Sequence, residues 1–263
     1  MNDREVGQYW DANADAWTAL SRAGYDQSRD LFNTPQFLAI LPEIRGLRGL
    51  DIGCGEGHNT RLLAERGAKM TGIDISAKFL GYARESDRAR PLGIAYLHAS
   101  AHELPFADAS FDFATAFMSL MDMPEPERAV REAYRVIRPG GFFQFSICHP
   151  CFQTWRWQWI RDKDGRKTGI VCGDYFARRD GAVEEWIFGA APEELKQRYP
   201  KFRIPRFFRT LSEWVGMLLA AGFTLTRFQE PAPDAQTVRE RPGFAGDRLF
   251  AWFLHLQCRK EGA

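Results

Sequence analysis

The stretch "LDIGCGEGHNT", residues 50–60, decides the fold, because three alternate glycines follow directly on an apolar run. A glycine-rich turn that leaves a strand and opens a helix lets a ligand approach the backbone closely. In doubly wound α/β folds such turns lie at the carboxyl ends of the strands, where ligands bind. The stretch therefore predicts a ligand-binding loop.

The spacing of the glycines narrows the class of ligand. Gly53, Gly55 and Gly57 read G-x-G-x-G, whereas the dinucleotide fingerprint, G-x-G-x-x-G, needs a glycine where His58 stands. The Gly-Lys-Ser/Thr sequence of a Walker loop is also missing. Asp74 ends the next apolar run, 21 residues after Gly53, where a carboxylate can accept both hydroxyls of a ribose. The pattern favours a ribose over a pyrophosphate.

A carboxylate before the glycines agrees with a ligand that lacks phosphates. Asp51 is unsuited to a phosphate site, but it can hold the amides of the turn or an ammonium group of the ligand. An adenosine that carries an amino acid fits all three features. The structural alternatives are that Gly55 and Gly57 serve only the turn and that Asp74 caps a helix.

The periodicity of the chain predicts four segments. Residues 1–47 carry aromatic residues at helical spacing and predict a cap of short helices. Residues 48–148 alternate five strands with helices and predict βαβ units in a parallel sheet, the core domain. Residues 149–210 are rich in tryptophan, arginine and proline without a clean period, which indicates a substrate lid. Residues 211–263 predict a helix and two strands that form an antiparallel pair at one sheet edge.

Composition and charge describe an ordinary globular protein. The 263 residues carry a formal net charge of +1, so global charge indicates no partner. We expect neither a secretory signal nor a membrane span, because both need longer uncharged apolar stretches.

The cysteines indicate the redox environment of the protein. Five cysteines without CxxC spacing favour reduced thiols and a cytoplasmic location. His149 stands between Cys148 and Cys151, but a second ligand pair is missing and we expect no metal.

Four segments in order make the chain resemble the class I S-adenosylmethionine-dependent methyltransferases, in particular the small-molecule branch labelled type 11. They are "LDIGCGEG", "GIDIS", "ASAHELPFADASFDFA" and "VIRPGGFFQFS". The resemblance implies a Rossmann-like doubly wound α/β fold. Its seven-stranded sheet would be mostly parallel with one antiparallel edge strand, with an N-terminal helical cap and a lid inserted after strand five. It also implies S-adenosyl-L-methionine as the cofactor.

The resemblance further implies where the cofactor lies along the glycine loop. Gly53, Cys54 and Gly55 would line the methionine part. Asp74 would bind the ribose hydroxyls, with Ile75 beside the adenine.

The same resemblance places a second group of residues around the adenine and the sulfonium. Ala101 and His102 would edge the adenine, and Phe117 and Met118 would lie near the methionine and sulfonium. One departure is Ser100, which stands where the family commonly has an aspartate that contacts the adenine amino group. A serine hydroxyl can still accept that hydrogen bond.

Aromatic residues of the N-terminal segment are candidates for closing the pocket. Tyr9 and Trp17 could fold over the cofactor, and the Tyr9 hydroxyl could reach the methionine carboxylate. Core packing is the alternative for either residue.

One histidine is a candidate catalytic base. His149 follows the fifth predicted strand, and its unperturbed pKa suits proton removal near neutrality. The alternative is a histidine that bonds to the turn of "HPCF".

The insert predicts the chemistry of the methyl acceptor. Residues 151–210 hold 13 Lys and Arg against 8 Asp and Glu, together with many aromatic residues. Aromatic walls with arginines suit a flat or apolar small molecule that bears a carboxylate or phosphate. The alternative is that the tryptophans fix the insert to the core and the arginines are solvated.

Three functions follow from these observations. The first is methyl transfer by direct displacement to an oxygen, nitrogen or carbon atom of a small molecule. The second is an RNA methyltransferase that uses the basic aromatic insert, which the small net charge and the missing "NPPY"-type tetrapeptide disfavour. The third is a noncatalytic cofactor-binding or scaffold protein on the same fold.

Overall fold

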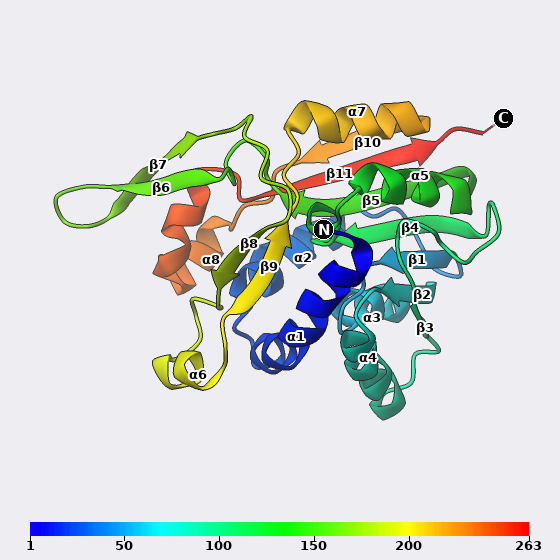
Figure 1. Cartoon of the computed structure of the whole chain (residues 1–263), viewed down its shortest axis with the longest axis horizontal. Helices are drawn as coiled ribbons and strands as arrows, with labels where there is room; N and C mark the ends of the chain where they lie inside the picture. The colour runs from blue at the N-terminus through cyan, green and yellow to red at the C-terminus, as the bar shows by residue number, and fades with distance from the viewer. Residues whose placement is uncertain (263) are drawn as a thin grey trace.

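A seven-stranded sheet forms the centre of the protein in the computed structural model, which describes residues 1–262 (Figure 1). The strand order is β10-β11-β5-β4-β1-β2-β3. Its strands are β1 (Arg48–Ile52), β2 (Lys69–Asp74), β3 (Ala95–His98), β4 (Phe111–Phe117), β5 (Ile137–Cys148), β10 (Phe223–Gln229) and β11 (Phe253–Lys260). The first five pair in parallel, and β11 runs antiparallel to both β5 and β10. The expected sheet with an antiparallel pair at one edge is confirmed; β11 lies one place in from the edge strand β10.

Helices cover both faces of this sheet, as a doubly wound fold requires. Successive residues of a strand point to opposite faces, so Phe113 of β4 joins one core cluster and Ala114 joins the other. One cluster packs α5 (Pro126–Val136) and α7 (Leu211–Ala221) on the sheet. The other packs α2 (Thr34–Ala39), α3 (His58–Glu65) and α4 (Ala77–Ala89) on the opposite face.

Local sequence explains where these helices begin and end. α7 starts with a capping box in which Thr210 and Glu213 bond to each other's backbone amides, and it ends at Gly222 with φ +97°. α5 begins with Pro126, whose missing N–H costs nothing in the first turn. The helix predicted within residues 211–263 is thus α7.

The N-terminal segment differs in detail from the expected short helices. A single long helix, α1 (Asp3–Arg22), is followed by the π-helix η1 (Arg29–Asn33) and then by α2. The Asn2 and Glu5 side chains form a capping box at the start of α1.

The insert forms two hairpins rather than irregular chain. β6 (Arg156–Arg161) pairs with β7 (Lys167–Gly173), and β8 (Ala182–Trp186) pairs with β9 (Phe202–Arg206), with α6 (Glu193–Arg198) between β8 and β9. The second hairpin packs on α1, where Trp17 contacts Phe188 and Phe202. β6, β7 and β8 are mostly half-buried or exposed, because each hairpin has only two strands, whereas β9 buries Phe202 and Ile204.

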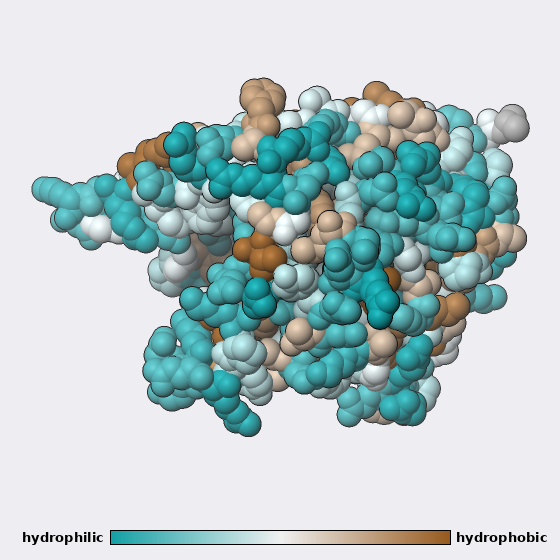
Figure 2. All heavy atoms as spheres, in the orientation of Figure 1, coloured by the Kyte–Doolittle hydropathy of each residue, from teal (hydrophilic) through white to brown (hydrophobic). Residues whose placement is uncertain are grey.

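The outer surface is largely polar. Figure 2 shows hydrophilic residues over most of the face seen in Figure 1, with hydrophobic residues in small separate groups. Within residues 1–262, every helix is too short or too polar to cross a membrane. Between β10 and β11 the chain forms α8 (Ala235–Glu240) and the 3-10 helix η3 (Pro242–Arg248).

Candidate functional site

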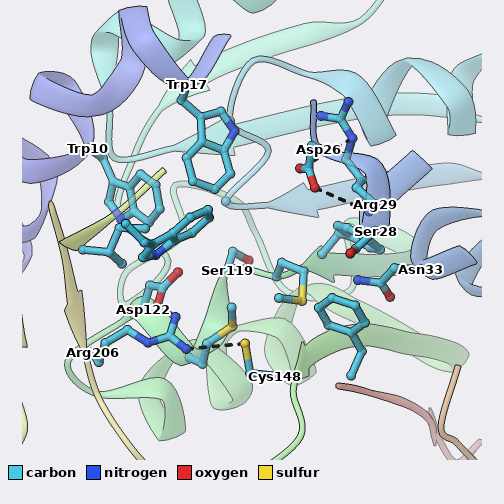
Figure 3. Close-up of a pocket in the computed structure, with 18 of the residues that line it drawn as sticks. Trp10, Trp17, Asp26, Ser28, Arg29, Asn33, Ser119, Asp122, Cys148 and Arg206 are labelled. Carbon is cyan, nitrogen blue, oxygen red and sulfur yellow. Dashed lines mark hydrogen bonds and ion pairs between the residues drawn. The ribbon is translucent and has the colours of Figure 1, made fainter. Parts of the chain in front are cut away.

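A cavity of about 1130 Å³ lies at the carboxyl ends of β1, β2, β4 and β5. α1, the segment 25–33 and the insert close it from the other sides (Figure 3). Pockets for a single small ligand are typically about 300–1,000 Å³, so this cavity has room for more than one. The sequence-predicted residues in its wall are Trp17, Gly53, Cys54, Gly55, Asp74, Ile75, Ser100, Ala101, His102, Phe117 and Met118.

The glycine loop forms one side of the cavity and needs its glycines. Gly53 has φ +71°, and a Cβ there would lie 2.5 Å from the Cβ of Ser119. Gly55 has φ +55°, and a Cβ there would meet nothing within 4 Å. The amides of Gly53 and Cys54 donate to the Ile73 carbonyl at 2.9 Å each, which ties the loop to β2. The loop therefore offers bare backbone at Gly55 to a ligand.

Asp74 joins this loop to the end of β2. Its two carboxylate oxygens accept the amides of Gly55 and Ser76, each at 2.8 Å. The helix N-cap of α4 is Ser76, whose Oγ accepts the Phe79 amide. Asp74 therefore does not serve as the N-cap, and its carboxylate lines the cavity.

Three carboxyl groups line the same cavity, with Asp74 and Asp122 buried and Asp26 half-buried. Burial raises the pKa of Asp26, Asp74 and Asp122 to about 6 in each case. The Arg29 guanidinium opposes this shift at Asp26, and the Arg206 guanidinium opposes it at Asp122. Perturbed carboxyl groups gather at functional sites, because ligands and reactions require charge in protected places. This clustering marks the cavity as the candidate active site.

The first turns of α1 cover the end of the cavity that holds Ile75 and Ala101. Gly7 packs against Ile75, since a Cβ at Gly7 would lie 3.2 Å from the Ile75 side chain. The Asp3 carboxylate accepts the Ser100 hydroxyl and pairs with Nδ1 of His102 at 2.9 Å. The Ser100 hydroxyl thus donates to α1, and Asp3 itself lines the cavity.

Two predicted residues lie outside the cavity wall. The ring of Tyr9 lies under the guanidinium of Arg203, 5.5 Å from its centre, because α1 turns this residue toward the insert. Asp51 is 2 % exposed and accepts the hydroxyls of Thr60 and Thr115 at 2.6 and 2.9 Å. Asp51 therefore supports the loop from beneath, and we leave both residues out of the proposed cofactor contacts.

His149, the candidate base, is also outside the wall. Its Nδ1 accepts the Cys151 amide at 3.2 Å, and its Nε2 bonds to the Glu230 carboxylate at 2.9 Å. Burial lowers its pKa, although Glu230 opposes the shift. With both ring nitrogens engaged and the side chain buried, this arrangement agrees with the alternative of a histidine that bonds to its own turn.

Several polar residues of the cavity wall were not predicted as site residues one by one, although Arg206 belongs to the basic insert expected to meet the acceptor. Some come from the segment after α1, and others are brought together only by the fold. Figure 3 shows Asp26, Arg29 and Asn33 on one side of the cavity and Asp122, Cys148 and Arg206 on another. They are Asp3, Asp26, Ser28, Arg29, Asn33, Ser119, Asp122, Cys148, Glu184 and Arg206. The π-helix at Arg29–Asn33 would have been the signal for the first group, since π-helical turns often mark functional sites, but short sequence patterns do not predict it.

Comparison with known proteins agrees with this geometry. Residues 50–145 match the family model described as a methyltransferase domain. A crystal structure of an S-adenosylmethionine-dependent methyltransferase from Mesorhizobium loti is 29% identical, with a TM-score of 0.70 over 86% of this chain and 96% of that chain. Residues 50–145 form a domain of the class I S-adenosylmethionine-dependent methyltransferases. S-adenosylmethionine is accordingly the cofactor of this methyltransferase.

Curated relatives of the methyltransferase share its core rather than its whole length. The malonyl-[acyl-carrier protein] O-methyltransferase of Pectobacterium atrosepticum is 36% identical over 49% of this chain and 51% of that protein. The 27-O-demethylrifamycin SV methyltransferase of Amycolatopsis mediterranei is 38% identical over 52% of this chain and 56% of that protein. The chain thus spans about half the length of the curated relatives it matches.

Proposed function

We propose that this methyltransferase transfers a methyl group from S-adenosylmethionine to an oxygen, nitrogen or carbon atom of a small molecule bound in the same cavity. The observation that carries the proposal is the cavity of about 1130 Å³, which has a glycine-and-aspartate end and a second end walled by the insert. The two curated relatives described above are named for methylation of a carrier-bound acid and of a rifamycin. Their names support a small-molecule acceptor as the class.

The residues at the first end fit the cofactor. The Asp74 oxygens each hold one backbone amide, and their remaining lone pairs can accept the ribose hydroxyls. Ile75 and Ala101 offer apolar surface for the adenine, under the cover of α1. The bare backbone at Gly55 leaves space for the methionine part.

The bound cofactor supplies an activated methyl group for displacement. The protein aligns the acceptor atom with that methyl and excludes water, which is the main catalytic task in such a transfer. Phe117 and Met118, at the end of β4, line the cavity and provide apolar surface there. Trp10 and Trp17 reach in from α1 and close the cavity on another side, as Figure 3 shows.

Calorimetry tests the first half of the proposal. We expect purified protein to bind S-adenosylmethionine and S-adenosylhomocysteine saturably with one site per chain. A panel of phenols, amines, carboxylic acids and carbon acids then tests turnover by formation of S-adenosylhomocysteine. Absence of cofactor binding contradicts the proposal. Binding without turnover above background on the whole panel favours a noncatalytic cofactor-binding protein, and strongly salt-dependent RNA binding favours an RNA methyltransferase.

Three carboxyl groups predict how cofactor selectivity depends on pH. Asp26, Asp74 and Asp122 have pKa values raised to about 6, so they are largely neutral at pH 5 and ionised at pH 7. The sulfonium is positively charged and the thioether of the product is not. A single added charge about 10 Å away contributes roughly 1 kcal/mol. We therefore expect the affinity ratio of S-adenosylmethionine to S-adenosylhomocysteine to rise at least about threefold from pH 5 to pH 7; a flat ratio in calorimetry contradicts this.

A further inference from the structure

The end of the cavity away from Asp74 holds an ionic cluster that consists of Asp122, Cys148, Glu184 and Arg206. Arg206 enters from β9 and pairs with the Asp122 carboxylate at 3.0 Å and with the Glu184 carboxylate at 3.4 Å. Its guanidinium also donates to the Cys148 sulfur at 3.4 Å. Figure 3 shows Arg206, Asp122 and Cys148 together on one side of the cavity. We call this group the acceptor-end cluster.

Asp122 lies close to the cofactor end. It is the last residue of the 3-10 helix η2 (Leu120–Asp122), which follows β4 directly. Ser119, just before η2, donates to the Ile52 carbonyl at 2.7 Å and is the neighbour that a Cβ at Gly53 would strike. A single short turn therefore links the glycine loop to the Asp122 carboxylate, which is 5 % exposed.

The acceptor-end cluster is not a free anion site. Arg206 faces two carboxylates, so the cluster has a surplus of negative charge when both are ionised. It is the only insert arginine in the described part of the cavity wall. Four other insert arginines pair with acids away from that wall: Arg156 and Arg179 with Asp174, Arg178 with Glu213, and Arg209 with Asp180. Arg203 lies outside the wall and pairs with Glu185, which lines it.

The rest of the cavity wall is acidic as well. The charged side chains that line it are the acids Asp3, Asp26, Glu56, Asp74, Asp122, Glu184, Glu185 and Asp247, and the bases Arg29, Lys167 and Arg206. Arg29 bonds to Asp30 at 2.8 Å, and the Lys167 ammonium lies 4.0 Å from the centre of the Trp159 ring. An acceptor with a carboxylate or phosphate would thus meet more acids than bases in this wall, where Arg29 and Arg206 are already paired with carboxylates. This disfavours the anionic acceptor expected from the insert's composition.

Aromatic rings supply the remaining surface at this end. Trp157 and Trp186 line the cavity from the two hairpins, and Trp252 lines it from the segment before β11. Rings of this kind bind flat molecules by stacking and edge contacts. They also hold cations over their faces, which an anion cannot use.

On the basis of the proposed methyl transfer, we propose that the acceptor is an aromatic molecule without negative charge whose O–H or N–H donates to Asp122. The acceptor atom forms a new bond to the methyl carbon. The bond between the methyl carbon and sulfur breaks, and the electron pair of that bond stays on sulfur. The proton of the acceptor passes to the Asp122 carboxylate. Arg206 positions that carboxylate, and Glu184 keeps the arginine from attracting anions. A pKa of about 6 for Asp122 suits proton acceptance near neutrality.

Three probes of one shape test the charge preference. They are the neutral 4-hydroxybenzamide, the cationic tyramine and the anionic 4-hydroxybenzoate, each titrated by calorimetry with S-adenosylhomocysteine present. We expect the neutral and cationic probes to bind at least tenfold more tightly than the anion. Tighter binding of the anion, or binding of none of the probes, overturns the acceptor class. S-adenosylhomocysteine is titrated first, so the two failures can be told apart. If S-adenosylhomocysteine binds and the probes contradict the expected order, only the acceptor class is overturned. If S-adenosylhomocysteine does not bind, the proposed function is overturned.

Variants test whether the acceptor-end cluster sets this preference. Asp122→Asn with Glu184→Gln frees Arg206, so we expect 4-hydroxybenzoate to gain at least tenfold in affinity and the tyramine preference to vanish. Asp180→Asn is the control, because it removes the acidic partner of Arg209 away from the cavity wall. With S-adenosylhomocysteine affinity retained as the sign of a folded protein, an unchanged probe order in the double variant overturns the proposal.

Asp122→Asn alone is expected to lower turnover of the preferred probe about 100-fold. Unchanged turnover overturns the proposed proton transfer to Asp122.

Discussion

Asp74→Asn is expected to weaken S-adenosylmethionine binding about 100-fold. The carboxylate accepts the Gly55 and Ser76 amides, and an asparagine must place its own NH₂ against one of these donors. The ribose hydroxyls also lose a charged acceptor, and hydrogen bonds to charged groups contribute about 1.5–3 kcal/mol each. A total loss of roughly 3 kcal/mol corresponds to about two orders of magnitude in affinity, since about 1.4 kcal/mol is tenfold. Calorimetry measures the change directly.

Asp51→Asn is the matched control for this variant. Asp51 is a buried aspartate on the neighbouring strand, but it lies outside the cavity wall and accepts two threonine hydroxyls. These hydroxyls can rotate to accept from an amide, so we expect cofactor affinity within about threefold of wild type. Equal losses in the two variants would show that the effect is structural. Undiminished affinity in Asp74→Asn would remove the proposed ribose contact.

Gly53→Ala is expected to lower cofactor affinity by about 10- to 100-fold. Gly53 has φ +71°, where a side chain costs about 1–2 kcal/mol, and its Cβ would lie 2.5 Å from the Cβ of Ser119. Overpacking of this kind costs about 1–3 kcal/mol or forces the neighbour to move. Ser119 holds the end of β1 through the Ile52 carbonyl, so its movement shifts the loop that faces the ligand.

Gly93→Ala separates backbone strain from this local clash. Gly93 has φ +72°, nearly the same conformation, but a Cβ there meets nothing within 4 Å and the residue is outside the cavity wall. We expect both variants to lose thermal stability and only Gly53→Ala to lose additional stability and cofactor affinity. Thermal unfolding and calorimetry on the same samples measure both effects. Equal cofactor affinity in the two variants contradicts the role given to Gly53.

The sheet and the cofactor could be predicted from local sequence. The glycine loop follows β1 and Asp74 ends β2, so each stands at the end of a buried strand. Parallel strands bring such ends to one edge, and the register pairs Asp51 with Gly72 and Ile52 with Ile73. The contact between Gly55 and Asp74 follows from these short-range patterns.

The insert was harder to predict for a physical reason. In β6 the half-buried Trp157 and Trp159 alternate with exposed residues, but β7 and β8 show no regular alternation of buried and exposed positions. The orientation of Tyr9 toward Arg203 depends on how the second hairpin packs on α1. The hydrogen bond at Nε2 of His149 likewise comes from Glu230, which is 81 residues away along the chain.

The sequence by itself determined the methyl donor, because the residues that favour adenosine stand at fixed places after consecutive strands of a regular fold. The charge at the acceptor end was decided only by tertiary structure. The insert is basic in composition, yet Arg206 meets Asp122, 84 residues earlier, and Arg156, Arg178, Arg179 and Arg209 pair with acids away from the cavity wall. Charges act through distance in space, and only the folded chain sets which charges lie close together.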